Sequence, residues 1–315
     1  MKQILFIEPV LKERIWGGTR LKEYGYDLPS DQTGECWAIS AHPHGDCVVR
    51  NGLYSGKTLN SLWNDHRELF GYTEGKEFPL LIKIIDARTD LSVQVHPDDA
   101  YAAEHENGAF GKTECWYVLD CKEDATIVIG HNAKTKEEAE QLIREGRFRE
   151  LIREIPVHKG DFFQIEPGVL HAIKGGTLIL ETQQNSDITY RVYDYDRLQN
   201  GKKRELHTEQ SIAVLKCPFR PNLGKPVTYR VGAAQVDHLI TCPYYSVEHI
   251  TLYGSASFTA GKVFQNLSII DGQGAIDGVP VRKGDHLIIP AEYGIFELSG
   301  DLQVIRSSPC ELMVK

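Results

Sequence analysis

Long apolar runs are missing from this 315-residue sequence, and so is any extended stretch of positive charge. A membrane-spanning helix needs roughly 20 consecutive apolar residues, so none is expected. The formal net charge is −9, from 35 Lys and Arg against 44 Asp and Glu, which disfavours nucleic acid and anionic membranes as partners. No Gly-x-Gly-x-x-Gly motif follows a strand-like segment, which argues against a nicotinamide-dinucleotide site.

Cysteine occurs seven times, an odd number, and never in a Cys-x-x-Cys pair. This usage predicts free thiols in a reducing compartment and argues against a thiolate zinc site. The N-terminus lacks the pattern of a signal peptide, because Glu8 interrupts the apolar core that such a segment needs. We therefore expect a cytoplasmic protein.

Short strand-like segments separated by Gly, Asp, Asn and Pro dominate the first two-thirds of the chain, which is typical of a jelly roll or barrel. They are Phe78–Ile85, Leu91–Val95, Cys115–Leu119, Ala125–Ile129, Gly160–Ile165 and Thr177–Thr182. Helical periodicity interrupts them at about residues 58–70, 98–106, 135–153 and 208–216. We expect Gly146 to divide the third helical stretch, which would cover the open end of the barrel.

A proline-rich stretch, Pro218–Pro226, is followed by strands alone, which predicts a catalytic domain at 1–228 and a second β-barrel at 229–315. The expected strands are Tyr245–Tyr253, Phe264–Ile270, His286–Ile289, Ile295–Glu297 and Leu302–Ile305, with turns at Asp277-Gly278, Lys283-Gly-Asp285 and Ser299-Gly-Asp301. Gly284–Pro290 echoes Gly160–Pro167, which indicates an internal duplication. The second copy has Tyr293-Gly294 where a ligand histidine would be needed, so we expect it to hold no metal.

Four residues of the first domain are candidate metal ligands: Gln94, His96, Glu114 and His171. Gln94 and His96 are two apart in a strand-like segment, so their side chains share a face. A single strand histidine is more often a packed residue than a ligand, but here the residues combine with a Gly-Asp turn and a Pro-Gly turn before His171. Two imidazoles, a carboxylate and an amide oxygen suit zinc, manganese, iron or cobalt, and leave a position open for substrate.

These segments resemble the type I mannose-6-phosphate isomerase (phosphomannose isomerase) family of the cupin superfamily, in its short bacterial form. The resemblance rests on Ile15-Trp-Gly-Gly18, Gly34-Glu-Cys-Trp-Ala-Ile-Ser40, Leu80-Leu-Ile-Lys-Ile-Ile-Asp86, Ser92-Val-Gln-Val-His-Pro97, Gly111-Lys-Thr-Glu114, His171-Ala-Ile and Thr189-Tyr-Arg-Val-Tyr-Asp-Tyr-Asp196. It implies a mainly β protein of two cupin-like jelly-roll barrels. It also implies a metal-dependent aldose–ketose isomerase that interconverts mannose 6-phosphate and fructose 6-phosphate through an enediol(ate), with one zinc ion per chain.

The resemblance further implies three catalytic positions, Arg191, Lys112 and Glu181, and two substrate-binding positions in the pocket wall, Trp16 and Glu35. Ser92 is two residues before Gln94 and so shares its face, and we expect it to bind the phosphate. Arg191 offers a fixed charge and a planar fork of donors for an enediolate or phosphate oxygen. The alternative for Arg191 is a surface salt bridge to Asp194 or Asp196. Lys112 is expected to transfer a proton or stabilise charge, and Glu181 to act as a base or an orienting group.

Two other functions stay open at this point. An iron-dependent cupin oxygenase would use similar ligands, although Gln94 then stands where a histidine is usual. A non-catalytic sugar-binding cupin would need neither Lys112 nor Glu181 nor Arg191, so their presence favours catalysis. The expected partner is a phosphorylated sugar, and the expected assembly is a monomer or a weak homo-oligomer.

Overall fold

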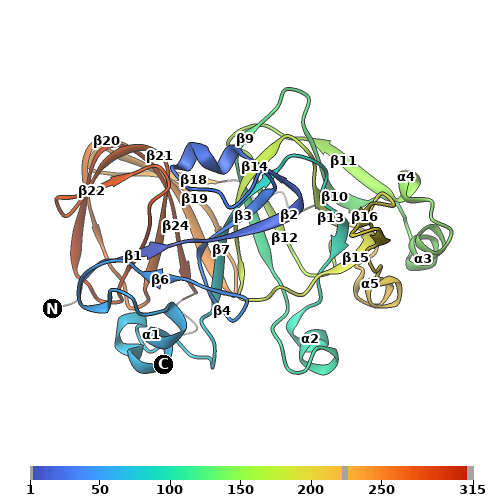
Figure 1. Ribbon diagram of the computed structural model, residues 1–315, viewed down its shortest axis with the longest axis horizontal. Helices are drawn as coiled ribbons and strands as arrows, with labels where there is room; N and C mark the ends of the chain where they lie inside the picture. The colour runs from blue at the N-terminus through green and yellow to red at the C-terminus, as the bar shows by residue number, and fades with distance from the viewer. Residues whose placement is uncertain (1–2, 222–225, 311–315) are drawn as a thin grey trace.

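The computed structural model describes residues 3–221 and 226–310. It is mainly β, and its strands form two regions that lie side by side (Figure 1). The first is a jelly-roll sandwich of two facing sheets, and the second is a single strongly curved sheet. In the described residues the strand pairings leave these sheets open at their edges. The expectation of a mainly β, cupin-like jelly-roll architecture with helical insertions is confirmed.

Each sheet of the sandwich is antiparallel, and its strands come from distant parts of the sequence. The five-stranded sheet has the order β11 (Ile152–Pro156), β10 (Thr126–His131), β13 (His171–Ile173), β8 (Val93–Val95) and β15 (Tyr190–Tyr193). The six-stranded sheet has the order β12 (Phe162–Ile165), β9 (Glu114–Cys121), β14 (Thr177–Gln184), β7 (Leu80–Ala87), β2 (Val10–Gly18) and β3 (Thr33–Ile39). Two short hairpins complete the region: β4 (Ala41–His42) with β5 (Gly45–Asp46), and β16 (Leu198–Gln199) with β17 (Lys202–Lys203).

The six-stranded sheet is buried on both faces, which explains the near-continuous apolar runs in its sequence. Along β9, Cys115 and Tyr117 pack outward against the second region, whereas Trp116 and Val118 face the inside of the sandwich. The inner face of β9 also carries Glu114, since side chains alternate along a strand. Cys115 therefore points to the opposite face from Glu114.

The second region contains nine strands, and two of them come from the start of the chain. Its order is β18 (Val227–Val231), β19 (Ala234–Thr241), β20 (Tyr245–Thr259), β24 (Ile295–Pro309), β21 (Gln265–Ile276), β23 (His286–Ile289), β1 (Leu5–Glu8) and β6 (Val48–Val49), with β22 (Val279–Arg282) paired to β21. Because β1 hydrogen-bonds to β23, the N-terminal strand ties the two regions together. A boundary at 228/229 stays a prediction, and part of the proline-rich stretch before it, residues 222–225, lies outside the described residues.

The helices occupy the four predicted stretches. They are α1 (Leu59–Asp65), α2 (Asp99–His105), α3 (Lys136–Arg144), α4 (Phe148–Leu151) and α5 (Thr208–Val214), with 3-10 turns at Arg20–Tyr24, Gly52–Tyr54 and Arg67–Phe70. Gly146 adopts a φ of +69° and separates α3 from α4, as expected. Helices α3, α4 and α5 pack against the outer face of the five-stranded sheet (Figure 1). Among the described residues, no helix has the length and apolarity needed to cross a membrane.

One predicted turn is wrong. The segment Ser299-Gly-Asp301 does not reverse the chain, because β24 runs without interruption from Ile295 to Pro309. Gly300 lies beside Gly254 on one neighbouring strand and beside Gly274 on the other. The three glycines let the strands bend and approach closely at this row, which is a strand role for glycine rather than a turn role.

We predict that Gly300→Ala destabilises the second region by about 1–3 kcal/mol. A Cβ at this position would lie 2.5 Å from the Gly274 Cα, and the φ of +118° disfavours any other residue. The matched control is Gly278→Asn in the Asp277-Gly278 turn, where φ is +76° and an added Cβ would meet no heavy atom within 4 Å. Because Asn tolerates this conformation, urea unfolding should detect little change in the control. Equal stability of Gly300→Ala and the parent would contradict the prediction.

Candidate active site

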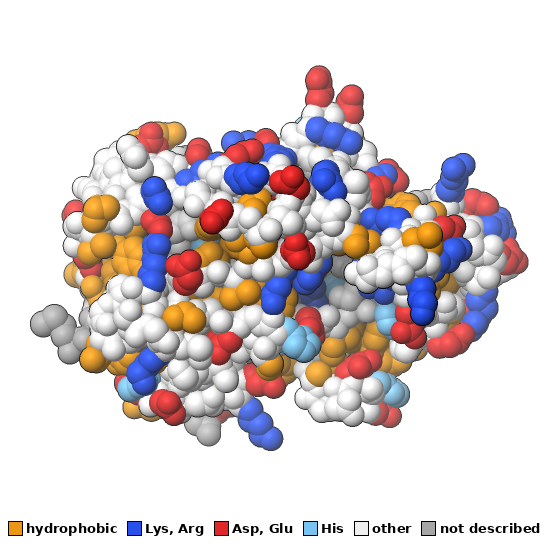
Figure 2. All heavy atoms as spheres, viewed as in Figure 1, with side chains coloured by type: hydrophobic (Ala, Val, Ile, Leu, Met, Phe, Trp, Pro, Cys, Tyr) orange, Lys and Arg blue, Asp and Glu red, His pale blue; other side chains and the backbone are white. Residues whose placement is uncertain are grey.

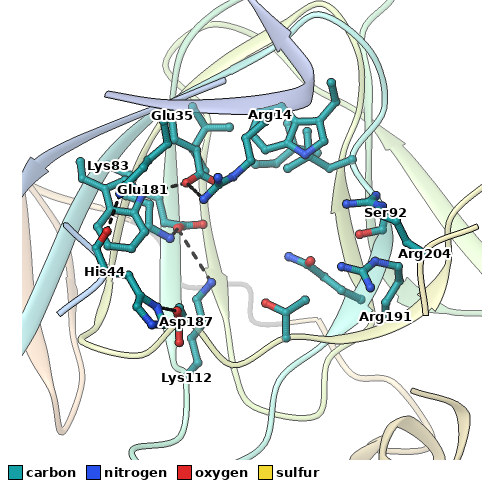
Figure 3. Close-up of a pocket in the computed structure, with 18 residues that line it drawn as sticks. Arg14, Glu35, His44, Lys83, Ser92, Lys112, Glu181, Asp187, Arg191 and Arg204 are labelled. Carbon is teal, nitrogen blue, oxygen red and sulfur yellow. Dashed lines mark hydrogen bonds and ion pairs between the residues drawn. The ribbon is translucent and has the colours of Figure 1, made fainter. Parts of the chain in front are cut away.

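A cavity of about 440 Å³ opens between the two sheets of the sandwich (Figure 3). It is lined by Lys12, Arg14, Trp16, Glu35, Trp37, His44, Lys83, Ile85, Leu91, Ser92, Gln94, Lys112, Ile173, Glu181, Asp187, Thr189, Arg191 and Arg204. All six predicted catalytic and substrate-binding residues are in this set, together with Gln94. The three other predicted ligands, His96, Glu114 and His171, are buried beside the cavity.

Strand register brings the predicted ligands together from distant parts of the chain. Gln94 pairs with His171 on one neighbouring strand and with Arg191 on the other. Glu114 comes from the facing sheet, where it pairs with Gln183 and Ile165. The ligand cluster therefore bridges the two sheets of the sandwich.

The ligand atoms of this cluster converge on one point. His96 Nε2 and His171 Nε2 are 3.1 Å apart, and each lies 3.4 Å from a Glu114 carboxylate oxygen. Four ligands held 2.0–2.2 Å from one tetrahedral ion stand roughly 3.3–3.6 Å apart, so these separations match a shared cation. The Gln94 amide lies 3.3 Å from His171 Nε2 and completes the group. Rotation of this amide by 180° exchanges its nitrogen for an oxygen ligand.

The hydrogen bonds of the cluster leave His171 Nε2 and Glu114 Oε1 available to a metal ion. His171 Nδ1 lies 2.8 Å from the Val169 carbonyl oxygen, to which it donates, so its Nε2 lone pair faces the cluster. Glu114 Oε2 lies 2.9 Å from Lys112 Nζ, whereas Oε1 is fully buried and has no hydrogen-bond partner within the described residues. Buried acceptors of this kind are costly unless a cation or donor satisfies them. The residues present therefore fit a divalent metal ion.

The charge states of the cluster also suit a cation. Burial, followed by the charge of Lys112, lowers the pKa of His96 to about 3, so the imidazole is neutral near pH 7. Burial likewise lowers the pKa of His171. Burial opposes ionisation of Glu114, but Lys112 and the two histidines outweigh it and hold the Glu114 pKa well below its usual range. The cluster thus offers two neutral imidazoles and one carboxylate.

Lys112 and Glu181 form a buried charge network beside the ligands. Lys112 Nζ lies 2.9 Å from Glu114 Oε2. It also lies 4.0 Å from Glu181 Oε1 (Figure 3). Burial disfavours the charged form of Lys112, but the two carboxylates outweigh it and raise the Lys112 pKa above its usual value. Glu181 accepts hydrogen bonds from Lys83 Nζ at 3.1 Å and from Trp116 Nε1 at 3.0 Å. Both of its oxygens are therefore held in place.

Arg191 faces the cavity and does not form a surface salt bridge with Asp194 or Asp196, which was the alternative expected for it. Its Nη1 donates to the Glu205 carbonyl oxygen at 2.7 Å, while its Nε is buried and has no partner among the described residues. Asp194 instead binds Arg197 and Arg204, and Asp196 binds Lys203. Arg191 thus keeps donors free for a ligand in the cavity.

Several cavity residues escaped the sequence reasoning: Lys12, Arg14, Trp37, His44, Lys83, Asp187, Thr189 and Arg204. The sequence could have indicated Lys83, because a lysine inside the apolar run Leu80–Ala87 is unusual for a buried strand. It indicated Arg14 less clearly, since Arg14 is two residues from Trp16 and so shares its face. Arg14 donates to Glu35 at 2.8 Å, and Trp37 Nε1 donates to the same carboxylate at 2.7 Å.

The lining of the cavity is basic although the protein is acidic. Six lysines and arginines line it, against three acids: Lys12, Arg14, Lys83, Lys112, Arg191 and Arg204, against Glu35, Glu181 and Asp187. The space-filling view shows Asp and Glu side chains spread over the outer surface, with Lys and Arg at the recess near the centre (Figure 2). A low-dielectric pocket concentrates the field of such charges, so this site attracts anions despite the net charge of −9.

A second group of possible ligands, His42, His44 and Asp187, lies at the rim of the cavity. Here the hydrogen bonds argue against a metal. His42 Nδ1 accepts from the His44 backbone N–H at 3.1 Å, so the neutral ring carries its proton on Nε2. His44 Nδ1 lies 2.6 Å from an Asp187 oxygen, and its side chain is 72% exposed. This group is better explained as a hydrogen-bonded rim than as a second metal centre.

Comparison with known proteins agrees with this geometry. A family model described as the catalytic domain of type I phosphomannose isomerase matches residues 4–139, and one described as the cupin domain of mannose-6-phosphate isomerase matches residues 235–309. The mannose-6-phosphate isomerase ManA of Bacillus subtilis is 52% identical over 308 residues, which span 96% of this chain and 98% of that protein. The mannose-6-phosphate isomerase of Streptococcus mutans is 48% identical over 98% of each chain.

Solved structures match as well. The crystal structure of a mannose 6-phosphate isomerase from Bacillus subtilis has a TM-score of 0.95 and 46% identity, and covers 97% of this chain and 99% of its own. A putative mannosephosphate isomerase from Archaeoglobus fulgidus, at 23% identity, shares the fold with a TM-score of 0.77 over 97% of this chain and 98% of its own. Because full-length relatives and family models for both regions agree, the chain belongs to the type I phosphomannose isomerase family, whose members are metal-dependent isomerases.

Proposed function

We propose that this protein interconverts mannose 6-phosphate and fructose 6-phosphate through an enediol(ate). The observation that carries the proposal is the meeting of three groups at one cavity. The ligand cluster of Gln94, His96, Glu114 and His171 adjoins the cavity, the Lys112–Glu181 network is at its wall, and Arg191 lies on the strand beside Gln94. Full-length relatives named as mannose-6-phosphate isomerases support this reaction.

The metal we propose is zinc, one ion per chain, held by Gln94, His96, Glu114 and His171. When bound there, a divalent cation supplies polarisation of a sugar carbonyl and its neighbouring hydroxyl. The neutral histidines and the ionised Glu114 suit this role. Their burial keeps the polar groups of the site away from bulk water.

The group that stabilises the developing oxyanion is assigned to the cavity wall. Aldose–ketose isomerisation moves a proton between adjacent carbons, which requires a base and a stabiliser of the oxygen that becomes negative. Lys112 Nζ carries its proton at neutral pH, because Glu114 and Glu181 outweigh burial and raise its pKa. We assign Lys112 to donate to the developing oxyanion. Glu181 is assigned to orient Lys112, since donors occupy both Glu181 oxygens.

The remaining cavity residues are assigned to bind the substrate. Arg191 keeps an unpartnered Nε and a planar fork, which suits an enediolate or phosphate oxygen. Ser92 lines the same cavity and is assigned to the phosphate. Trp16 and Glu35 form pocket walls, and Glu35 is fixed by Arg14 and Trp37. Their contribution is the shape of the pocket rather than proton transfer.

The relatives and the cavity disfavour the two alternative functions. An iron-dependent oxygenase has no support among the named relatives. A binding-only protein does not require the buried Lys112–Glu181 pair beside a metal site, because burying two charges is costly. All seven cysteines are free, which supports our proposal of a cytoplasmic enzyme. We further propose that it acts as a monomer or a weak homo-oligomer, with the catalytic domain at 1–228.

The reaction is tested by a coupled assay of the purified, metal-loaded protein on mannose 6-phosphate, with fructose 6-phosphate as the measured product. Charge-assisted contacts to phosphate contribute about 1.5–3 kcal/mol each, so free mannose should be a poorer substrate in kcat/KM by at least about tenfold. Equal kcat/KM for the two sugars would refute the phosphosugar proposal while leaving the metal site standing. Absence of any fructose 6-phosphate would refute the reaction itself.

The ligand assignment predicts that His171→Ala loses most of its bound metal, because one of two imidazoles disappears from the cluster. Elemental analysis of the folded variant provides the measurement. His42→Ala tests the rim group and His286→Ala tests the second region; both should keep their metal. His286 is buried between Tyr26 and Ser268, so its variant is expected to be less stable even though it retains metal. Stoichiometric metal in folded His171→Ala would count decisively against the site.

The role of Arg191 predicts a sharp fall in kcat/KM, of about tenfold or more, for Arg191→Lys. Lysine keeps the charge but loses the planar fork of donors. Arg144→Lys is the matched control, since Arg144 lies on the surface in ion pairs with Glu140 and Glu209. Steady-state kinetics at saturating metal should separate the two variants. Parent-like kinetics for Arg191→Lys would make the assignment wrong.

A further inference from the structure

The short segment Gly111–Thr113 precedes Glu114 and carries Lys112, so its position sets the geometry of the active site. Three backbone N–H groups hold it. Gly111 N–H donates to Asp99 Oδ1 at 2.8 Å, and Lys112 N–H donates to the Pro97 carbonyl oxygen at 3.0 Å. Thr113 N–H donates to Gln184 Oε1 at 2.8 Å. Two of these three acceptors are side chains rather than strand partners.

Asp99, in the first turn of α2, is the acceptor at the centre of this arrangement. Its Oδ1 accepts from Gly111 N–H and also from Gln184 Nε2 at 3.0 Å. Its Oδ2 accepts from the Tyr244 hydroxyl at 2.7 Å. Since Gln184 in turn accepts from Thr113 N–H, Asp99 fixes both ends of the segment, one directly and one through Gln184.

Close packing at Gly111 shows how tightly this contact is built. A Cβ on Gly111 would lie 2.4 Å from the Asp98 carbonyl carbon and 2.5 Å from the Asp99 backbone nitrogen. Only glycine allows the two backbones to approach so closely. The segment therefore sits directly against the start of α2, and a movement of Asp99 is transmitted to Gly111.

Tyr244 reaches this point from the second region, in the turn between β19 and β20. The next residue, Tyr245, is fully buried and donates to Gln164 Oε1 at 3.1 Å. Gln164 is on β12 and pairs with Cys115, the neighbour of Glu114 on β9. Tyr244 thus contacts Asp99, which holds Gly111, and Tyr245 contacts Gln164, which pairs with Cys115. These two contacts lie on either side of Lys112 and Glu114 in the sequence.

We propose that the second region positions Lys112 and Glu114 through the hydrogen bond from Tyr244 to Asp99. Tyr244 and Asp99 are positioning residues, since neither lines the cavity nor belongs to the ligand cluster. A hydrogen bond to a carboxylate orients it, and Asp99 then orients Gly111 and Gln184. The second region accordingly has a function in the reaction although it carries no ligand of the cluster. This inference rests on the proposed metal site for its effect on catalysis, but not for the contact itself.

The test removes one hydroxyl group, with Tyr244→Phe, in the full-length protein. Tyr229→Phe is the matched control, because Tyr229 is also in the second region and donates to the carboxylate of Glu248 at the same distance, 2.7 Å. Hydrogen–deuterium exchange of the peptide around residues 110–114 reports on the contact independently of metal and substrate. Zinc affinity, by competition with a chelator, and kcat on mannose 6-phosphate report on its consequence.

For Tyr244→Phe we expect faster exchange at residues 110–114 and a rise of about threefold to tenfold in the zinc dissociation constant, below the 10–100-fold typical of partners that touch a ligand directly. A fall in kcat of similar size should accompany it, and Asp99→Asn should reproduce these effects without adding fully to them. Tyr229→Phe should leave all three measurements unchanged. Parent-like exchange at 110–114 in Tyr244→Phe would overturn the proposal, whatever the metal does. A lower melting temperature with unchanged exchange, zinc affinity and kcat would also overturn it, because the hydroxyl would then serve stability alone.

Discussion

The negative charge of Glu114 is the constraint on which the rest of the site depends. Its side chain is completely buried between the two sheets, where an uncompensated carboxylate is prohibitively costly. Lys112 approaches from the cavity side and the two imidazoles from the facing sheet, so their polar atoms surround the carboxylate. Burial keeps these imidazoles neutral, so their lone pairs are available to a cation. A divalent cation held by these residues would satisfy all these groups together.

The cavity is lined mainly by cations although the protein as a whole is acidic. Net charge describes the whole surface, whereas the field in a cavity is set by the few groups that line it. Here arginines and lysines face inward, and four of them are anchored by carboxylates: Arg14 by Glu35, Lys83 by Glu181, Lys112 by Glu114 and Arg204 by Asp194. Arg191 differs from these in keeping a buried donor unpartnered among the described residues. This difference makes Arg191 the cation most available to a substrate.

The second region is connected to the site more intimately than a separate structural barrel would be. Strand β1 lies in the second sheet and leads directly into β2 of the sandwich, and Leu5 and Ile7 share a hydrophobic core with residues of both regions. The contacts of Tyr244 and Tyr245 extend this connection to the segment that precedes Glu114. The second region therefore shares a hydrophobic core with the sandwich and is hydrogen-bonded to residues next to the site.

The sequence by itself determined what is local. Alternation placed Gln94 and His96 on one face of a strand, and periodicity located the helices, including their interruption at Gly146. These features depend on neighbours one to four residues away, so a single chain is sufficient to read them. The prediction of a turn at Ser299-Gly-Asp301 was wrong, because Gly300 is required there by its pairing with Gly254 and Gly274 on neighbouring strands.

Only the tertiary structure decided which distant residues meet. The pairing of Gln94 with His171 and Arg191, the anchoring of Glu181 by Lys83, and the reach of Tyr244 to Asp99 all follow from strand register and sheet packing. Register is set by the burial of whole faces rather than by any one residue, so no short motif encodes it. The candidate ligands were thus visible in the sequence through their types and spacing, and Lys112 and Arg191 through the family resemblance, whereas the other cavity cations, the tyrosine contacts and the cavity itself were recognised only in the structure.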